Sequence, residues 1–354
     1  MREWIDALPQ ALVKHHAWLN YWNGVSLLAG SPELSGPLLE TAYWRFVEED
    51  DLDGQLASCS AAVLANHSDL ADFRPLDTWV SRLTGLIAQS VPFPSPLAEL
   101  QSNTALAYYA HVRKPNAEFY DAVTHRALQL LEADIPVNDR VVPACLMLHS
   151  LREAGRMADC SRIIAAVQPH LHDSNVSAGD AAYWWDARVW EATSRGDLRT
   201  AAQAATKGDE IFAKNAIASS ARPVYSNMIL AALAFQRWDL NGAEAHIAKM
   251  ESYLRPERWL ERGWAAWIRS IVSSMRDDFE SAIKFARMEL DILAGAGAVF
   301  HLYYAHLHIA GGLIGLRRYA EAHAEIEHAR ALLTDTFEFR NLADVDFMAA
   351  WLAL

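Results

Sequence analysis

Histidine clusters are the residues of this chain that come nearest to a metal site. His301, Tyr304 and His308 share one face of a predicted helix, and His170 and His172 lie together at the end of another. A metal site needs three or four converging ligands, and the sequence contains no His-Glu-x-x-His motif. We therefore predict no metal site and no cofactor, and expect these histidines to cap helices or to lie on the surface.

Paired carboxylates are the second group that could support chemistry. Asp277-Asp278 and the run from Glu48 to Asp51 resemble acid/base pairs, but they lie in predicted turns between helices. Acidic residues there favour the N-terminus of the following helix. Nucleophile motifs such as Gly-x-Ser-x-Gly are missing. These absences predict a protein that is not an enzyme.

Aromatic residues form a stronger pattern. In the repeated helical hairpins described below, equivalent positions on the first helix of each hairpin carry aromatic and polar side chains. The ten residues that we select as candidate binding residues are Tyr183, Asp186, Trp190, Tyr225, Met228, Trp264, Trp267, Tyr304, His149 and Arg152. Val142, Cys145, Phe235, Ile271 and Leu307 occupy equivalent positions. Such a stripe suits a peptide helix or an apolar small molecule; the alternative is that these aromatics form the interhelical core.

A repeated pattern defines the helices that carry these residues. A large residue is followed three positions later by a small one at Tyr319, Phe279, Leu240, Leu198 and Met157, with separations of 40, 39, 42 and 41 residues. This spacing is typical of a helix that must lie close against the preceding helix, and a fixed period indicates a repeat protein.

The sequence predicts an all-α fold, because no stretch alternates between apolar and polar residues as a strand would. The repeat resembles the tetratricopeptide hairpin, which implies a right-handed superhelix of tetratricopeptide-like hairpins (an α-solenoid). We expect one domain over residues 1–354, with degenerate repeats over 1–90, regular repeats over 97–333 and a capping helix over 342–354. The regular hairpins are expected at 138–154 with 156–171, 177–195 with 198–214, 219–237 with 239–254, 257–275 with 278–294, and 298–316 with 318–333. The chain ends on an apolar run, which we interpret as a piece cut from a longer protein.

Composition narrows the function further. The 354 residues carry a formal net charge of -13 and lack a Lys/Arg cluster of five or more, so we expect no direct contact with nucleic acid. No apolar run approaches the roughly 18 residues of a membrane span. Three cysteines without metal-ligand spacing favour a reduced, cytoplasmic setting. Thirteen tryptophans suggest tight packing or a recognition surface.

The N-terminal segments provide a resemblance to a family. The stretch from Trp18 to Gly24, followed by residues 38–43 and by the run from Asp72 to Trp79, resembles the repeat region of MalT-like and LuxR-type signal-transduction ATPases. The resemblance implies a sensor region that binds an inducer or a regulatory protein and controls self-association. The phosphate-binding loop and the helix-turn-helix of that family are absent from this sequence.

We therefore expect a non-catalytic sensor or regulatory binding domain of a bacterial transcriptional regulator. Its partner would be a small-molecule inducer or a regulatory protein, bound in a concave groove. The alternative is a protein-protein interaction scaffold, or a self-association module that uses the outer surface or the C-terminal helix and has no ligand pocket.

Overall fold

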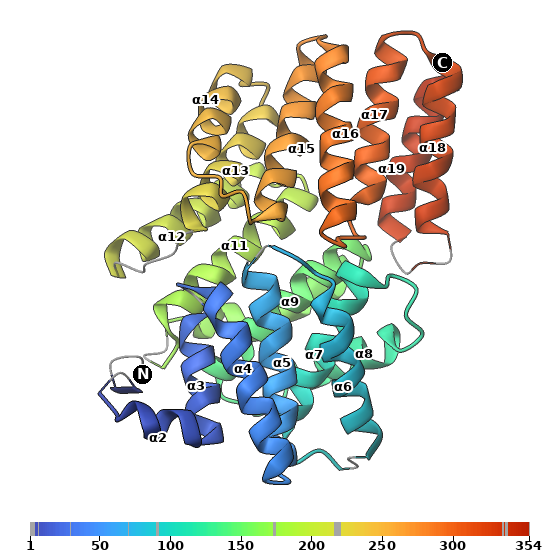
Figure 1. The fold of residues 1–354 in the computed structure, drawn as a ribbon. Helices are drawn as coiled ribbons and strands as arrows, with labels where there is room; N and C mark the ends of the chain where they lie inside the picture. Colours follow the sequence, from blue (N-terminus) through green and yellow to red (C-terminus); the bar gives the residue numbers. More distant parts are fainter. Residues whose placement is uncertain are drawn as a thin grey trace.

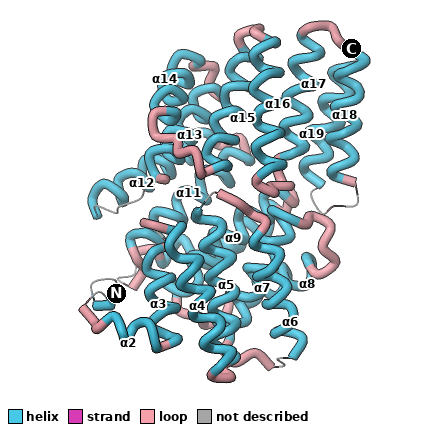
Figure 2. The backbone as a smooth tube through the Cα atoms, in the orientation of Figure 1, coloured by secondary structure: helices cyan, strands magenta, loops and turns pink. Residues whose placement is uncertain are grey.

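The structure, a computed structural model, describes residues 4–5, 7–28, 30–69, 71–89, 92–172, 175–215, 221–334, 336 and 339–353. These residues form helices and connecting loops and contain no strand (Figure 2). The helices are α2 Gln10–His15, α3 Ala17–Leu27, α4 Pro32–Glu48, α5 Leu52–Asp69, α6 Pro75–Gln89, α7 Pro96–Arg113, α8 Tyr120–Leu131, α9 Val137–Glu153, α10 Met157–Val167, α11 Ala178–Ser194, α12 Leu198–Asn215, α13 Arg222–Phe235, α14 Leu240–Glu251, α15 Trp259–Met275, α16 Phe279–Gly295, α17 Leu302–Gly315, α18 Tyr319–Leu333 and α19 Phe339–Ala353. A 3-10 turn, Gln168–His170, follows α10. No helix in these ranges is long and apolar enough to cross a membrane.

Successive antiparallel helices form a solenoid that curves so that its two halves lie one above the other (Figure 1). The odd-numbered helices from α3 to α17 face inward, and the even-numbered helices cover them from outside. The prediction of an all-α solenoid of tetratricopeptide-like hairpins is confirmed, and the hairpins after residue 137 closely follow the predicted ranges.

Some predicted helix starts differ from the structure by a few residues. Helix α17, expected from residue 298, begins at Leu302. The last helix, expected from residue 342, begins at Phe339. A sequence pattern locates the ends of a helix only to within a few residues.

The repeated small residues explain how the hairpins close. Each regular outer helix begins at the large residue of the repeat, and the small residue three positions later is fully buried. These buried residues are Cys160, Ala201, Ala243, Ala282 and Ala322, each 0% exposed. Their short side chains let the second helix lie close against the first, so the forty-residue pattern records a packing requirement.

The turns within the hairpins share one backbone conformation. Gly155, Gly196, Trp238, Asp277 and Arg317 each adopt a positive φ between 60° and 74°. The amide after each of these residues donates to a carbonyl five residues earlier, as from Asp239 to Ala234 at 3.0 Å. This arrangement is the Schellman motif, which ends a helix and favours glycine at the left-handed position.

Trp238→Gly tests the cost of that conformation. The Trp238 side chain is 74% exposed, so its removal loses little packing while glycine relieves the left-handed strain. We expect the free energy of unfolding to rise by about 0.5–1 kcal/mol, measured by urea denaturation. Gln236→Gly, two residues earlier at φ -64°, is the control and should lower stability. A destabilised Trp238→Gly variant would contradict the interpretation.

The two halves of the solenoid are joined by a loop that we call the clasp, residues 296–301 between α16 and α17. The Phe73 amide donates to the Ala296 carbonyl at 2.9 Å, and the Val299 amide donates to the Val112 carbonyl at 3.0 Å. Ala298 is fully buried in the same hydrophobic cluster as residues of the N-terminal half. The clasp therefore closes the curve of the solenoid, from the C-terminal half back to α6 and α7 (Figure 1).

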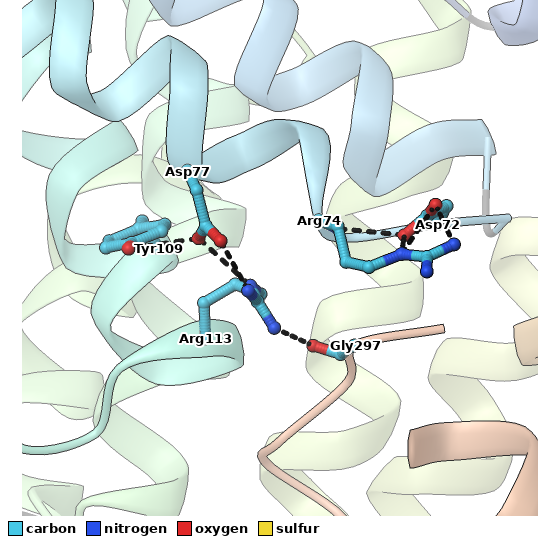
Figure 3. Close-up of polar contacts among 6 residues, drawn as sticks. All are labelled: Asp72, Arg74, Asp77, Tyr109, Arg113 and Gly297. Atoms are coloured by element: carbon cyan, nitrogen blue, oxygen red, sulfur yellow. Dashed lines mark hydrogen bonds and ion pairs between the residues drawn. The ribbon is translucent and has the colours of Figure 1, made fainter. Parts of the chain in front are cut away.

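Arg113 at the end of α7 adds polar bonds to this closure (Figure 3). One of its terminal nitrogens donates to the Gly297 carbonyl at 2.7 Å, and the other lies 2.5 Å from the Asp77 carboxylate. The Tyr109 hydroxyl also donates to Asp77, at 3.1 Å. A second link joins Arg258 to Glu33 at 3.4 Å. Backbone, apolar and charged contacts thus all hold the two halves together.

Gly297→Ala should open the clasp. Gly297 has a φ of +67°, and an added Cβ would lie 2.8 Å from the Arg74 Cγ and 2.9 Å from an Arg113 nitrogen. We expect a loss of more than about 2 kcal/mol of stability and at least tenfold faster hydrogen exchange at the Phe73 and Val299 amides.

Gly196→Ala is the matched control for that experiment. Gly196 has a similar φ of +74° but open space around the Cβ position, so it carries the conformational strain without the clash. Gly196→Ala should lower the free energy of unfolding by about 1–2 kcal/mol, and hydrogen exchange at the Phe73 and Val299 amides should change little. Equal effects of the two variants on those amides would show that the clasp does not depend on Gly297.

Candidate functional site

Closure of the solenoid surrounds a central cavity of about 1330 Å³. Its wall is formed by the inward faces of the odd-numbered helices, from Trp18 and Tyr21 on α3 to Tyr304 and His308 on α17. Residues of both halves of the chain therefore meet across one concave space.

All ten candidate binding residues line this cavity. They are His149 and Arg152 on α9, Tyr183, Asp186 and Trp190 on α11, Tyr225 and Met228 on α13, Trp264 and Trp267 on α15, and Tyr304 on α17. Val142 and Ile271 line it as well. Their common location agrees with the frame of the repeats; that they bind a ligand stays a prediction.

Three other positions of the predicted stripe are core residues. Cys145, Phe235 and Leu307 are 0%, 9% and 4% exposed and do not contribute to the cavity wall. Each lies on an inward-facing helix but is turned toward a neighbouring helix. The stripe of residues that a helix turns to one side is roughly 100° wide. Residues at the edge of that stripe therefore pack against neighbouring helices and do not face the cavity.

An aromatic wall forms where α11, α13 and α15 meet. The Trp190 indole donates to the Tyr225 hydroxyl at 2.7 Å, and the ring centroids of Trp190 and Trp267 are 6.3 Å apart. Trp264 lies edge-on to Tyr225 at 5.8 Å. These rings supply a large apolar surface with few rotatable bonds, which suits an apolar or aromatic ligand.

A buried ion pair lies beside the aromatic wall. Arg222 is 2.5 Å from Asp186 and 2.7 Å from Asp209, and its guanidinium also lies over the Phe212 ring. Burial raises the pKa of Asp186 to about 6, against the opposing effect of Arg222. Gly208 provides the space for this pair, because a Cβ there would lie 2.9 Å from Arg222 and 3.1 Å from Asp186.

Histidine and tyrosine residues form another part of the cavity wall. One ring nitrogen of His67 is 2.6 Å from the Tyr108 hydroxyl, and the other is 2.7 Å from the Tyr183 hydroxyl. Because a neutral imidazole has one donor and one acceptor, one tyrosine donates to His67 and the other accepts from it. The His149 ring lies 5.9 Å from that of His67.

Burial keeps these imidazoles neutral. It lowers the pKa of His67 to about 4 and that of His301 to about 3, and it lowers the pKa of His149 well below the usual range. In the C-terminal half, His308 is 3.3 Å from Glu289. Burial raises the pKa of Glu289, and the hydrogen bond with His308 opposes that rise. The cavity thus offers hydrogen-bonding groups whose charged states are suppressed.

Several cavity residues were absent from the sequence analysis. Tyr21 on α3 and His67 on α5 lie in the degenerate repeats, and Tyr108 and His111 on α7 lie at the start of the regular repeats; we selected no candidate residue from either region. The signal was present: Asp53, Ala57, Ser60, Leu64 and His67 recur every three or four residues and all line the cavity. His301 and His308, which we assigned to capping or surface roles, line the cavity instead.

His67→Gln should reduce the loss of stability in acid. The pKa of His67 in the folded protein is about 4, below the usual unfolded value of about 6.5, so the folded state binds fewer protons in this range. Titration of His67 therefore leaves the free energy of unfolding unchanged above about pH 6.5 and lowers it by roughly 3 kcal/mol between pH 6.5 and pH 4. The variant lacks this titration, so the slope of its free energy of unfolding against pH should be smaller near pH 5, by about 1.4 kcal/mol per pH unit.

Urea denaturation of both proteins across this pH range measures the difference in slope. The variant must be compared with the natural chain because Asp186 has the opposite effect on the pH dependence of stability. Its pKa is raised in the folded protein, so the folded state binds more protons at Asp186 than the unfolded state does. Identical slopes would show that His67 titrates alike in the folded and unfolded chains.

Comparison with known proteins supports the fold. No protein-family model matches the chain, and no curated protein matches it. Among solved structures, the Rap protein complexed with Competence and Sporulation Factor is 9% identical, with a TM-score of 0.56 over 95% of this chain and 96% of Rap. That likeness shows a shared tetratricopeptide-like helical fold.

Two further structures are similar at lower TM-scores. A signal-transduction ATPase with a tetratricopeptide repeat sensor from Pyrococcus horikoshii is 12% identical, with a TM-score of 0.43 over 89% of this chain and 50% of that one. Yeast Tom70 is 12% identical, with a TM-score of 0.41 over 97% of this chain and 85% of that one.

Proposed function

We propose that this all-α solenoid is a non-catalytic sensor domain that binds a small effector or a protein segment in its central cavity. The observation that carries the proposal is the location of the ten candidate residues on the wall of one cavity. The cavity, about 1330 Å³, exceeds the roughly 300–1,000 Å³ typical of sites for drug-sized ligands. A small molecule or a few residues of an extended peptide would therefore fit.

The cysteines of the chain and the polar groups of the cavity wall favour binding over catalysis. All three cysteines are buried, and burial raises the pKa of each thiol, which makes a poor nucleophile. His67 is already hydrogen-bonded to two tyrosines, and Arg222 is paired with two carboxylates. Aromatic rings and hydrogen-bonding groups without an activated nucleophile are the features of a recognition site.

We further propose that the chain belongs to a bacterial transcriptional regulator of the MalT-like or LuxR type and acts in the cytoplasm. The N-terminal segments that resemble those regulators support this context, as do the unpaired cysteines. Rap, which shares the fold, was solved in complex with Competence and Sporulation Factor. A factor bound by the same kind of solenoid is consistent with a sensor role here.

The alternative is a scaffold or self-association module that uses the C-terminal helix. On α19, Phe347 is 72% exposed and Trp351 is 44% exposed, whereas Val345 on the opposite side is fully buried. Two exposed aromatics on one helix suit a protein partner or a second copy of the chain. A Phe347→Ser variant that shifted the chain from a larger species to the monomer in analytical ultracentrifugation would favour this alternative.

Native mass spectrometry tests the cavity first. The chain purified under native conditions should carry extra mass that denaturation releases, and the released mass identifies the ligand. If the chain purifies without extra mass, the fluorescent apolar dye 8-anilino-1-naphthalenesulfonate serves as the probe, and its fluorescence should rise when it binds the cavity. Absence of both signals would contradict a ligand-binding cavity.

Trp190→Ala, Trp264→Ala and Trp267→Ala then locate the binding site. Each should weaken binding of the retained molecule or the dye at least tenfold, since truncation of a buried aromatic contact costs about 2 kcal/mol or more. The helical circular dichroism should be preserved. Trp238→Ala, an exposed tryptophan outside the cavity, is the control and should bind as the natural chain does. Unchanged affinity in all three variants would exclude the aromatic wall.

A further inference from the structure

A cluster of two histidines and a glutamate lies between the last two helices of the regular repeats. His306 is on α17, and Glu325 and His328 are on α18. The His306 Nδ1 is 2.6 Å from a Glu325 carboxylate oxygen, and the His328 Nδ1 is 3.8 Å from the same oxygen. One ligand-type atom from each residue lies within 4.8 Å of the others. Across the described part of the chain, this is the one group of three such residues that converges in this way.

The spacing of these residues places them on facing helix surfaces. Glu325 and His328 are three positions apart, so they lie on one face of α18. His306 reaches them from α17, whose other residues Tyr304 and His308 line the cavity. The cluster is therefore separate from the cavity wall, to which none of its three members contributes.

The geometry is close to that of a divalent metal site. Zinc is bound by histidine nitrogens and carboxylate oxygens at about 2.0–2.2 Å, which for tetrahedral coordination separates neighbouring ligand atoms by about 3.4 Å. The 2.6 Å and 3.8 Å separations found here lie on either side of that value. A bound ion would replace the hydrogen bond between His306 and Glu325. The exposure of His328, 66% for its side chain, leaves room for water as a fourth ligand.

We propose that His306, Glu325 and His328 bind one Zn²⁺ ion, or another divalent ion that prefers imidazole ligands such as Co²⁺, Ni²⁺ or Cu²⁺. Two imidazoles and one carboxylate select these ions over Mg²⁺ and Ca²⁺, which prefer sites made of oxygen ligands. The bound ion would link α17 to α18 and stabilise the last hairpin.

The sequence analysis assigned no metal site because it searched for ligands near one another in sequence. His306 and Glu325 are nineteen positions apart in the sequence, and only the antiparallel packing of α17 on α18 brings them together. The Glu-x-x-His spacing within α18 was present in the sequence, but without a third ligand it carries little weight.

Zinc binding by the full chain tests the proposal. Zn²⁺ titrated at neutral pH in competition with a chromogenic chelator should show one site per chain, and saturating Zn²⁺ should raise the melting temperature. His306→Ala, Glu325→Gln and His328→Ala should each weaken Zn²⁺ binding at least tenfold and abolish the thermal shift. Co²⁺ in place of Zn²⁺ should give the visible absorption bands of four-coordinate cobalt, which the variants should lose.

His323→Ala is the matched control, because His323 is an exposed histidine on the same helix outside the cluster. It should bind Zn²⁺ with the affinity of the natural chain. Melting curves without metal establish that each variant is folded, and the exposed position of His328 makes its variant the least disruptive. Equal Zn²⁺ affinity in the natural chain and in a variant lacking all three residues would overturn the proposal, as would an equal loss in His323→Ala.

Discussion

The hydrogen bonds of the clasp are the contact on which the rest of this structure depends. A solenoid is stabilised mainly by neighbouring repeats, so its two ends are free to lie apart. Here the Val299 amide bonds to Val112 and the Phe73 amide bonds to Ala296, across more than half of the chain. These bonds, with Arg113 and the buried Ala298, turn a curved array into a closed one. Without that closure the inward faces would line an open groove, and many of their polar groups would be hydrated.

Closure changes the chemistry of the groups that it encloses. Burial penalises charged forms, and the pKa shifts of His67, His301 and Asp186 all favour the neutral form. The enclosed groups compensate for lost hydration by bonding to one another, as in the contacts of His67 with two tyrosines. A ligand that enters must offer hydrogen bonds or apolar surface at least as good as those it displaces. This requirement gives such a cavity selectivity.

The same closure would connect binding to the shape of the whole chain. The cavity wall includes residues of both halves, and the clasp residues Phe300 and His301 belong to it. A ligand that contacts both halves would add to the energy that holds them together, whereas one that contacts a single half would not. For a sensor domain this arrangement offers a direct physical route from occupancy of the cavity to the arrangement of the outer surface.

The sequence alone determined the elements and their repeat. The large-and-small pattern of Leu240 with Ala243, and of Phe279 with Ala282, was readable because each helix must fit its neighbour locally. The inward-facing residues of the regular repeats followed from the same period, and all ten candidate residues indeed reach the cavity. Cys145, Phe235 and Leu307 did not, because a sequence period fixes a face of a helix only approximately.

Only the tertiary structure decided what those faces enclose. The meeting of residues 296–301 with Phe73 and Val112 depends on the summed curvature of many hairpins, and no local pattern encodes that sum. The pairing of His67 with Tyr183, and of His306 with Glu325, likewise joins residues whose separation in sequence carries no signal. Local packing rules are short-range and can be read from neighbouring residues; cavities and converging ligands are long-range, and folding creates them.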